Sequence, residues 1–302
     1  MGIIGKLPEI IARPAGRFGK PLLVHYHIYK NAGTSVEKNL AESYGHKWAV
    51  CEGAPEQIRL SNHDIAAFAR ANPGIRAISS HKARPSPARG RFFPIVFLRH
   101  PIDRARSVYS FAKRDPAQPD HAMARNLSFK DYVDWALETP GVPVRDYQVI
   151  HLSQASFRVA NIADAVARPE DLREVRDFLR SLPFFGLVRR FEESCRGFEA
   201  CYGRTFPALR MRPVRENAST EDALSERAAL DIARAELGEA VYWRLVEANQ
   251  FDLALYDTAV NLFDRNLARV CEPRLRRAGH AIVDLFRGAP ADADPAAAPP
   301  DR

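Results

Sequence analysis

The chain has 302 residues, of which 46% are hydrophobic, so it can bury a full core as one large domain or two modest ones. Lys and Arg number 44 against 37 Asp and Glu, and the resulting net charge of +7 favours an anionic partner. No zinc-finger spacing, aromatic RNA-binding motif or dense basic run is present, which argues against nucleic acid as that partner. The four cysteines form no C-x-x-C pair, so neither a disulfide framework nor a zinc site is indicated.

Residues 1–20 form a basic and apolar N-terminal segment. They contain no apolar run long enough for a secretory signal or a membrane span. Apolar side chains among cations leave a weak contact with a membrane surface open, although such clusters more often pack on their own domain. Because the composition is rich in Arg and Ala and no anchor is evident, the sequence predicts a cytoplasmic, bacterial protein.

Strands and helices alternate in the first part of the chain. Gly45 is a typical helix stop, Ser61 a typical helix cap, and Pro101 suits the first turn of a helix. In chain order the predicted elements are a strand at 21–28, helices at 34–44 and 61–71, strands at 75–80 and 93–98, and a helix at 101–113. This alternation predicts an α/β fold with a central parallel sheet flanked by helices.

The second half of the chain is rich in helices. The predicted elements are helices at 128–138, 169–182, 191–202, 219–238 and 252–270, with one short strand at 184–188. Residues 288–302 are rich in Ala, Pro and Asp, have almost nothing to bury, and are expected to be disordered. The sequence therefore predicts a single domain at 21–287 between two terminal segments.

The turn after the first strand carries the first chemical signal, in the sequence H-Y-H-I-Y-K-N-A-G-T-S. A strand that runs into a helix directs free backbone N–H groups and the positive end of the helix dipole at the loop, which makes this a natural anion site. The loop adds a cation, small residues that let the backbone approach an oxyanion, and two hydroxyls: Lys30, Asn31, Ala32, Gly33, Thr34 and Ser35. Together these residues suit a phosphate or a phosphosulfate.

Two other interpretations of this loop have to be weighed. In the P-loop of nucleoside triphosphatases, G-x-x-x-x-G-K-[ST], the lysine follows the second glycine, whereas here Lys30 precedes the loop's glycine. This order argues against a Walker A site and therefore against a kinase. A surface turn with chance polar residues stays open on this motif alone, because short loop motifs occur often.

A second motif lies in F-P-I-V-F-L-R-H-P-I-D-R-A-R-S-V-Y-S-F. It places Arg99 at the carboxyl end of a strand and Ser107 nearly two turns into the following helix. Ligands of open parallel sheets bind at the carboxyl ends of strands, so Arg99 and the Lys30 loop are expected to face one crevice. There Arg99 suits a bidentate contact with a second phosphate, to which Ser107 donates; a helix-start salt bridge and a packed serine are the alternatives.

Together the two motifs resemble those of the sulfotransferases that use 3′-phosphoadenosine 5′-phosphosulfate. H-I-Y-K-N-A-G-T-S is similar to the family's 5′-phosphosulfate loop, and R-H-P-I-D-R-A-R-S-V-Y resembles its 3′-phosphate element. Two positions depart from the pattern: Tyr29 replaces the usual proline, and His100 replaces the usual aspartate or asparagine at the helix start. The resemblance is closest to the carbohydrate branch, including the uronyl 2-O-sulfotransferases, and covers about residues 21–265.

This resemblance implies a P-loop-NTPase-like fold and transfer of a sulfuryl group to a hydroxyl of a carbohydrate or glycoconjugate, without a metal. Lys30 would stabilise charge on the leaving phosphate, and Arg99 with Ser107 would bind the 3′-phosphate. His81, in S-S-H, stands where the carbohydrate branch has its catalytic base, and an imidazole accepts a proton readily near neutral pH. The alternative for His81 is an ordinary strand-end histidine bonded to backbone.

Other polar residues carry weaker predictions. Gln148, His151 and Arg84 are candidates for contact with the acceptor or the nucleotide, with a packed helix and a solvated loop as the alternatives. His25 and His27 share one face of the first strand, but strand histidines two apart with no third ligand in view are more often packing residues than a metal site. A non-catalytic glycan- or nucleotide-binding protein on the same fold is the main alternative function, favoured by the departures at Tyr29 and His100.

Overall fold

The computed structural model describes residues 20–86, 91–213 and 225–287, with side chains described as far as Cys271. The predicted membrane contact of the N-terminal segment and the predicted disorder of 288–302 lie outside these residues. Within the described ranges, no helix combines the length and the apolar character needed to cross a membrane.

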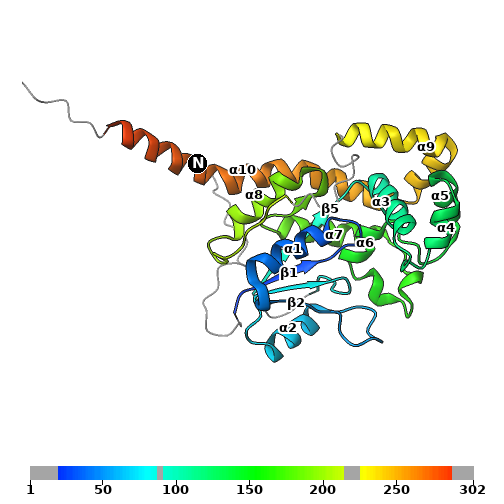
Figure 1. The fold of residues 1–302 in the computed structure, drawn as a ribbon, viewed down its shortest axis with the longest axis horizontal. Coiled ribbons are helices and arrows are strands. Elements are labelled where there is room, and N and C mark those ends of the chain that lie inside the picture. Colours follow the sequence, from blue (N-terminus) through cyan, green and yellow to red (C-terminus); the bar gives the residue numbers. More distant parts are fainter. Residues whose placement is uncertain (1–19, 87–90, 214–224, 288–302) are drawn as a thin grey trace, which may run out of the picture.

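Parallel strands form the centre of the molecule (Figure 1). Side by side, and all parallel, lie β2 (Trp48–Val50), β3 (Ala77–Ser80), β1 (Leu22–Tyr26) and β4 (Phe92–Ile95). The chain continues from β4 through Val96 into β5 (Phe97–Leu98), which pairs in parallel with β6 (Gly186–Leu187). This arrangement confirms the predicted α/β fold with a parallel sheet.

The chain changes direction across the sheet at β1. After β1 it builds β2 and β3 on one side, and then it crosses to the other side to build β4. In open parallel sheets a ligand-binding crevice forms outside the carboxyl ends of the strands at such a switch point. The topology therefore directs attention to the carboxyl ends of β1 and β4–β5.

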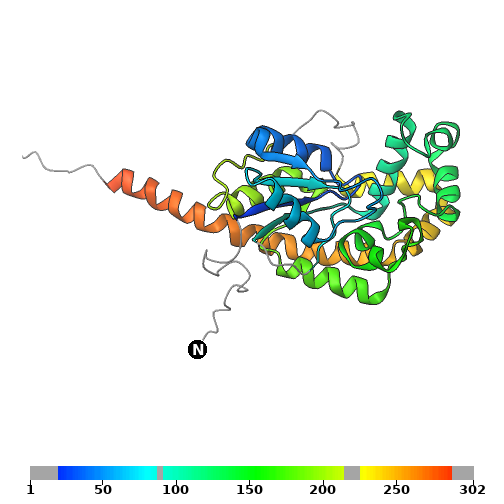
Figure 2. The same ribbon diagram turned by 90° about the horizontal axis from the view of Figure 1, so that it is seen from below.

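Helices cover the sheet on both faces. On β1, Tyr26 points toward α7 (Pro169–Ser181), where its ring meets Phe178 edge-on, with ring centroids 6.3 Å apart. His25 and His27 point the other way, toward the face covered by α1 (Gly33–Tyr44) (Figure 2). At the β6 edge, α10 (Gln250–Arg287) contacts α7 and α8 (Phe191–Tyr202).

A second group of helices gathers at one end of the molecule, on the right of Figure 1. It consists of α3 (Pro101–Arg114), α4 (His121–Asn126), α5 (Phe129–Glu138) and α9 (Glu226–Glu247). These helices bury their own apolar cluster, which includes Ile102, Val133 and Leu237. A glycine with positive φ, Gly238 (φ 67), interrupts α9 near the predicted helix end, but the chain then resumes the helix.

The predicted caps are confirmed. Ser61 accepts from Asp64 N–H in front of α2 (Asn62–Ala71), and Ser128 accepts from Asp131 N–H in front of α5. Strand β2 and helix α4 were not predicted. The segment around Gln148 and His151, for which a packed helix was one alternative, forms α6 (Tyr147–Leu152). Four short 3-10 helices complete the described chain: η1 (Gly45–Lys47), η2 (Ala155–Arg158), η3 (Ile162–Asp164) and η4 (Val188–Arg190).

Gly197 lets α8 pack closely on the residues before β6. A Cβ at this position would lie 2.0 Å from Cζ of the fully buried Phe184. We expect Gly197→Ala to lower the free energy of unfolding by about 1–3 kcal/mol, because overpacking outweighs the gain in helix propensity. Gly74→Ala is the matched control, since its Cβ meets nothing within 4 Å. Urea denaturation measures both variants, and equal stabilities would contradict this prediction.

Candidate functional site

Most of the strands lead into a charged or titratable residue at the carboxyl end. In the four-stranded sheet these residues are Glu52 after β2, His81 after β3, and His27 and Lys30 after β1; in the two-stranded sheet they are Arg99 after β5 and Arg189 after β6. We call Glu52, His81 and His27 the imidazole side, and Arg99, Arg189 and the intervening Asp103 the arginine side. The Lys30 loop lies between the two sides.

The Lys30 loop has an unusual backbone. Lys30 (φ 65) and Ala32 (φ 63) are both left-handed, which costs non-glycine residues of order 1 kcal/mol each. Between them, the buried Asn31 side chain donates to the carbonyl of Phe97 at 2.8 Å and to Oε1 of Gln148 at 2.7 Å. The loop is therefore held in a costly shape by contacts to its neighbours, as preorganised binding loops are.

Helix α1 begins at this loop without a side-chain cap. Ala32 occupies the N-cap position and has no side-chain acceptor, so it does not cap the first-turn N–H groups. Packing also requires a glycine at position 33, because a Cβ there would lie 1.7 Å from Nε2 of His27. Of the two hydroxyl residues, Thr34 is exposed and Ser35 is half-buried. The start of α1 thus offers amides and hydroxyls beside an imidazole.

On the arginine side, one buried carboxylate holds two guanidinium groups. Arg99 donates from Nε to Asp103 Oδ2 at 2.6 Å and from Nη2 to Oδ1 at 3.2 Å. Arg189 donates from Nε to Oδ2 at 3.0 Å and from Nη2 to Oδ1 at 2.5 Å. Burial alone would raise the pKa of Asp103, but the two arginines hold it below its usual range. Two guanidinium groups therefore share one carboxylate in this buried place.

The two sequence motifs meet in the structure. Nη1 of Arg99 lies 3.4 Å from the carbonyl oxygen of Lys30, although the residues are 69 positions apart. The alternative proposed for Arg99, a helix-start salt bridge, is also present, because Asp103 lies one turn into α3. The Lys30 ammonium lies over the ring of Phe111, 3.9 Å from its centroid, and Ser107 is half-buried on the same helix.

On the imidazole side, His81 is paired with a carboxylate. Glu52 Oε1 accepts from the His81 backbone N–H at 2.9 Å and lies 3.0 Å from Nδ1 of its ring. Burial raises the pKa of Glu52, but these two hydrogen bonds lower it below its ordinary value overall. An ionised carboxylate only accepts, so Nδ1 of His81 donates and Nε2 is left as a proton acceptor in the neutral ring. The side chain is 49% exposed, so solvent and ligands reach it.

The His81 ring also stacks on His27, with centroids 3.7 Å apart. The structure thus gives His81 a ring partner on one face and an orienting carboxylate at Nδ1, rather than the backbone contact of an ordinary strand-end histidine. This is the arrangement of an oriented general base.

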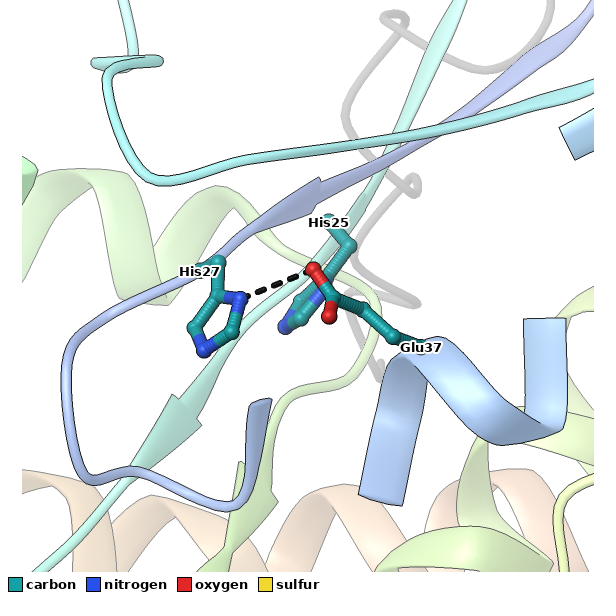
Figure 3. Close-up of side chains that lie close together, drawn as sticks. All are labelled: His25, His27 and Glu37. Carbon is teal, nitrogen blue, oxygen red and sulfur yellow. Dashed lines mark hydrogen bonds and ion pairs between the residues drawn. The ribbon is translucent and has the colours of Figure 1, made fainter. Parts of the chain in front are cut away.

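A second carboxylate–histidine contact involves His27, the ring that stacks on His81, and Glu37 (Figure 3). His27 Nδ1 lies 2.9 Å from Oε1 of Glu37 on α1, and His25 Nδ1 lies 3.2 Å from Oγ of Ser79. Burial and then the neighbouring imidazoles of His27 and His81 hold the pKa of His25 well below its ordinary value. His25 is therefore a neutral ring at physiological pH.

Three residues predicted to contact an acceptor or the nucleotide lie in the framework instead. Gln148 is fully buried, His151 is 1% exposed and Arg84 is 4% exposed. Arg84 Nη1 donates to the carbonyl of His81 at 2.8 Å and lies 3.3 Å from Nε2 of His151. Because these side chains are buried and bond other protein groups, we assign them no contact with an acceptor.

Gln148 links the arginine side to the start of α10. Asp252 accepts from the backbone N–H of Gln148 at 3.0 Å and of Val149 at 2.8 Å, in the place of a cap for α6. The Gln148 side chain bonds both the N–H of Arg99, at 3.0 Å, and its carbonyl, at 2.9 Å. Arg99 is therefore fixed through its backbone as well as through its guanidinium.

Asp146 gives this network a pH dependence. Burial and then the charge of Asp252 raise the pKa of Asp146 to about 7, with Arg104 opposing. Between the ordinary pKa of 3.8 and a pH of about 7, Asp146 stays protonated in the folded state but ionises in the unfolded state. The stability that this group contributes is therefore lost as the pH rises toward 7. The free energy of unfolding of Asp146→Asn minus that of wild type is therefore expected to be about 1–2 kcal/mol larger at pH 8 than at pH 5. Urea titrations at both pH values measure this, and a parallel pH dependence in both proteins would contradict it.

The two departures from the sulfotransferase pattern both have local partners. Nδ1 of His100 accepts from the N–H of Ile102 at 3.3 Å, so the imidazole caps α3. Burial lowers the pKa of His100 to about 4, which keeps this ring neutral and able to accept. The hydroxyl of Tyr29 donates to Gln118 at 3.0 Å. The imidazole of His100 thus caps the helix in place of an aspartate or asparagine, and a side-chain hydrogen bond holds Tyr29 in place of the usual proline.

Glu37, Glu52, Asp103 and Arg189 were not identified from the sequence. A signal existed for Asp103, which lies four residues after Arg99 on a predicted helix. Glu52 follows a strand of three residues, which gives no clear pattern. Arg189 follows a predicted strand, but its partner Asp103 lies 86 positions away.

Comparison with known proteins gives limited help. No family model matches this chain. An uncharacterized protein of Archaeoglobus fulgidus is 29% identical over 258 residues, which cover 80% of this chain and 97% of that protein.

Proposed function

We propose that this protein is a sulfotransferase with a P-loop-NTPase-like fold. It transfers a sulfuryl group from 3′-phosphoadenosine 5′-phosphosulfate to a hydroxyl of a carbohydrate or glycoconjugate. The observation that carries the proposal is the contact between Arg99 and the carbonyl of Lys30 at the switch point of the sheet. It brings two anion-binding motifs together from distant parts of the chain, as a ligand with two separate phosphate groups requires.

The donor binds across the Lys30 loop and the arginine side. The uncapped amides at the start of α1, with Lys30 and the hydroxyls of Thr34 and Ser35, take the 5′-phosphosulfate. Arg99, oriented by Asp103 and assisted by Arg189, takes the 3′-phosphate together with Ser107. The convergence of two guanidinium groups on Asp103 supports this division.

The acceptor reacts on the imidazole side. Its hydroxyl oxygen forms a new bond to sulfur as its proton passes to Nε2 of His81, and the bond from sulfur to the bridging phosphate oxygen breaks. The electron pair of that bond leaves with adenosine 3′,5′-bisphosphate, whose growing charge Lys30 balances. Glu52 is a positioning residue, because it holds the His81 ring in the tautomer that accepts at Nε2.

Lys30→Ala is expected to lower kcat by about 10²–10³-fold, because it removes a charge that matters most in the transition state. The fold is expected to survive, since the Lys30 side chain is half-exposed. Lys113→Ala is the matched control, an exposed lysine on α3 whose ammonium bonds Tyr109. Initial rates with saturating donor compare the variants, and equal rates for Lys30→Ala and Lys113→Ala would contradict the assigned role.

Product analysis tests the proposed reaction. The protein is incubated with ³⁵S-labelled donor and a panel of glycans that differ in charge and sugar type. A labelled glycan and release of adenosine 3′,5′-bisphosphate are the expected products. Binding of the bisphosphate with no labelled product across the panel would favour the non-catalytic alternative, and phosphorylated glycan formed from ATP would favour a kinase.

A further inference from the structure

His25, His27 and Glu37 place three metal-binding groups together beside the proposed donor loop. One ligand atom from each residue lies within 4.8 Å of the other two. Figure 3 shows the imidazole of His25 on β1, the imidazole of His27 just after that strand, and the carboxylate of Glu37 on α1 close together. Glu37 is the third ligand that strand spacing did not reveal, because it comes from the following helix.

The surroundings leave a nitrogen of His25 available as a ligand. Trp48 Nε1 donates to Ser79 Oγ at 3.1 Å, and Nδ1 of His25 lies 3.2 Å from the same oxygen. A serine oxygen accepts two hydrogen bonds, so it accommodates N–H donors from both rings. In the tautomer in which Nδ1 of His25 donates to this oxygen, Nε2 carries the lone pair, and a hydrogen bond from the other ring nitrogen to oxygen is typical of metal-binding histidines.

Burial and access also fit a bound ion. His25 is 1% exposed and His27 is 7% exposed, whereas the Glu37 side chain is 21% exposed and gives a path from solvent. Zinc binds imidazole nitrogen and carboxylate oxygen at about 2.0–2.2 Å, which places its ligand atoms roughly 3–3.5 Å apart. His27 Nδ1 and Glu37 Oε1 are already 2.9 Å apart, and the three ligand atoms lie within 4.8 Å of one another, so the cluster would contract around the ion.

We infer that His25, His27 and Glu37 form a binding site for a divalent transition-metal ion of the zinc class. Two imidazoles and one carboxylate are a common zinc ligand set, and three protein ligands leave a position for water or a substrate oxygen. The ion would replace the proton between His27 and Glu37. It would also join β1 to α1 and fix the His27 ring, which contacts both Gly33 and His81. This inference does not depend on the proposed sulfuryl transfer.

Metal titration of the untagged full chain tests this site. After dialysis against a chelator, the protein is titrated with Co²⁺, followed by visible absorption, and with Zn²⁺, followed by calorimetry. We expect one ion per chain, and we expect Glu37→Gln to weaken Zn²⁺ binding by at least about tenfold. Glu42→Gln, an exposed glutamate of the same helix, and His46→Ala, an exposed histidine just after it, are the matched controls.

Thermal unfolding separates loss of the site from loss of the fold. Zn²⁺ is expected to raise the melting temperature of wild type and of both controls, because it binds the folded state. Glu37→Gln without metal is expected to melt cooperatively and to gain little on addition of Zn²⁺. No saturable binding to wild type, unchanged binding to Glu37→Gln, or an equal loss in His46→Ala would each overturn the inference.

Discussion

Replacement of Asp103 by alanine is expected to lower the free energy of unfolding by about 3–5 kcal/mol, the cost of removing one partner from a buried ion pair. Asp103 is 3% exposed, and its carboxylate accepts four hydrogen bonds from Arg99 and Arg189. Those guanidinium side chains are themselves only 11% and 7% exposed. Without the carboxylate, two cations would face each other in a place that water barely reaches.

The matched control is Asp177→Ala. This carboxylate also pairs with an arginine, Arg180 at 2.9 Å, but its side chain is 76% exposed. Exposed pairs contribute about 0–1 kcal/mol, so the control is expected to remain close to wild type. Guanidinium denaturation of the three proteins measures the difference. A cost for Asp103→Ala as small as that of the control would mean that the arginine side is not held by this carboxylate.

His81→Ala is expected to reduce kcat by about 10²–10⁴-fold, the usual contribution of a positioned general base. Because the His81 side chain is half-exposed, the fold and the affinity for the donor are expected to change little. Glu52→Gln is expected to reduce kcat by a smaller factor with KM nearly unchanged, since it disturbs the orientation of the ring and not the base itself.

His63→Ala is the control for this experiment, an exposed histidine on α2 outside the site. Steady-state rates with an acceptor found by the product analysis provide the comparison. If His81→Ala turned over at the rate of His63→Ala, the base would have to be another group, and the pair formed by His81 and Glu52 would be structural.

The sequence predicted the framework of the site well because local signals determine it. The strands predicted at 21–28 and 75–80, the stop at Gly45 and the caps at Ser61 and Ser128 all depend on neighbouring residues, and all appear in the structure. The strand predicted at 93–98 is divided into β4 and β5, which belong to two sheets. The meeting of Lys30 and Arg99 was also predictable, since parallel strands bring their carboxyl ends to one edge of the sheet.

The partners of the site residues were not predictable in the same way. Glu52 reaches His81 from another strand, and Arg189 reaches Asp103 across 86 positions of the chain. Nothing local in the sequence encodes such pairs. Gln148 lies near the site, as predicted, but its side-chain amide makes hydrogen bonds to Asn31 and Arg99.

Calorimetry with adenosine 3′,5′-bisphosphate tests the proposed donor site most directly. Wild type is compared with Arg99→Ala, and with Arg114→Ala, which removes an exposed arginine at the end of α3. We expect wild type and Arg114→Ala to bind the bisphosphate at least about tenfold more tightly than AMP, and Arg99→Ala to lose this preference. Equal affinity of wild type for the bisphosphate and AMP would contradict the proposal, because the arginine side would then not recognise a 3′-phosphate.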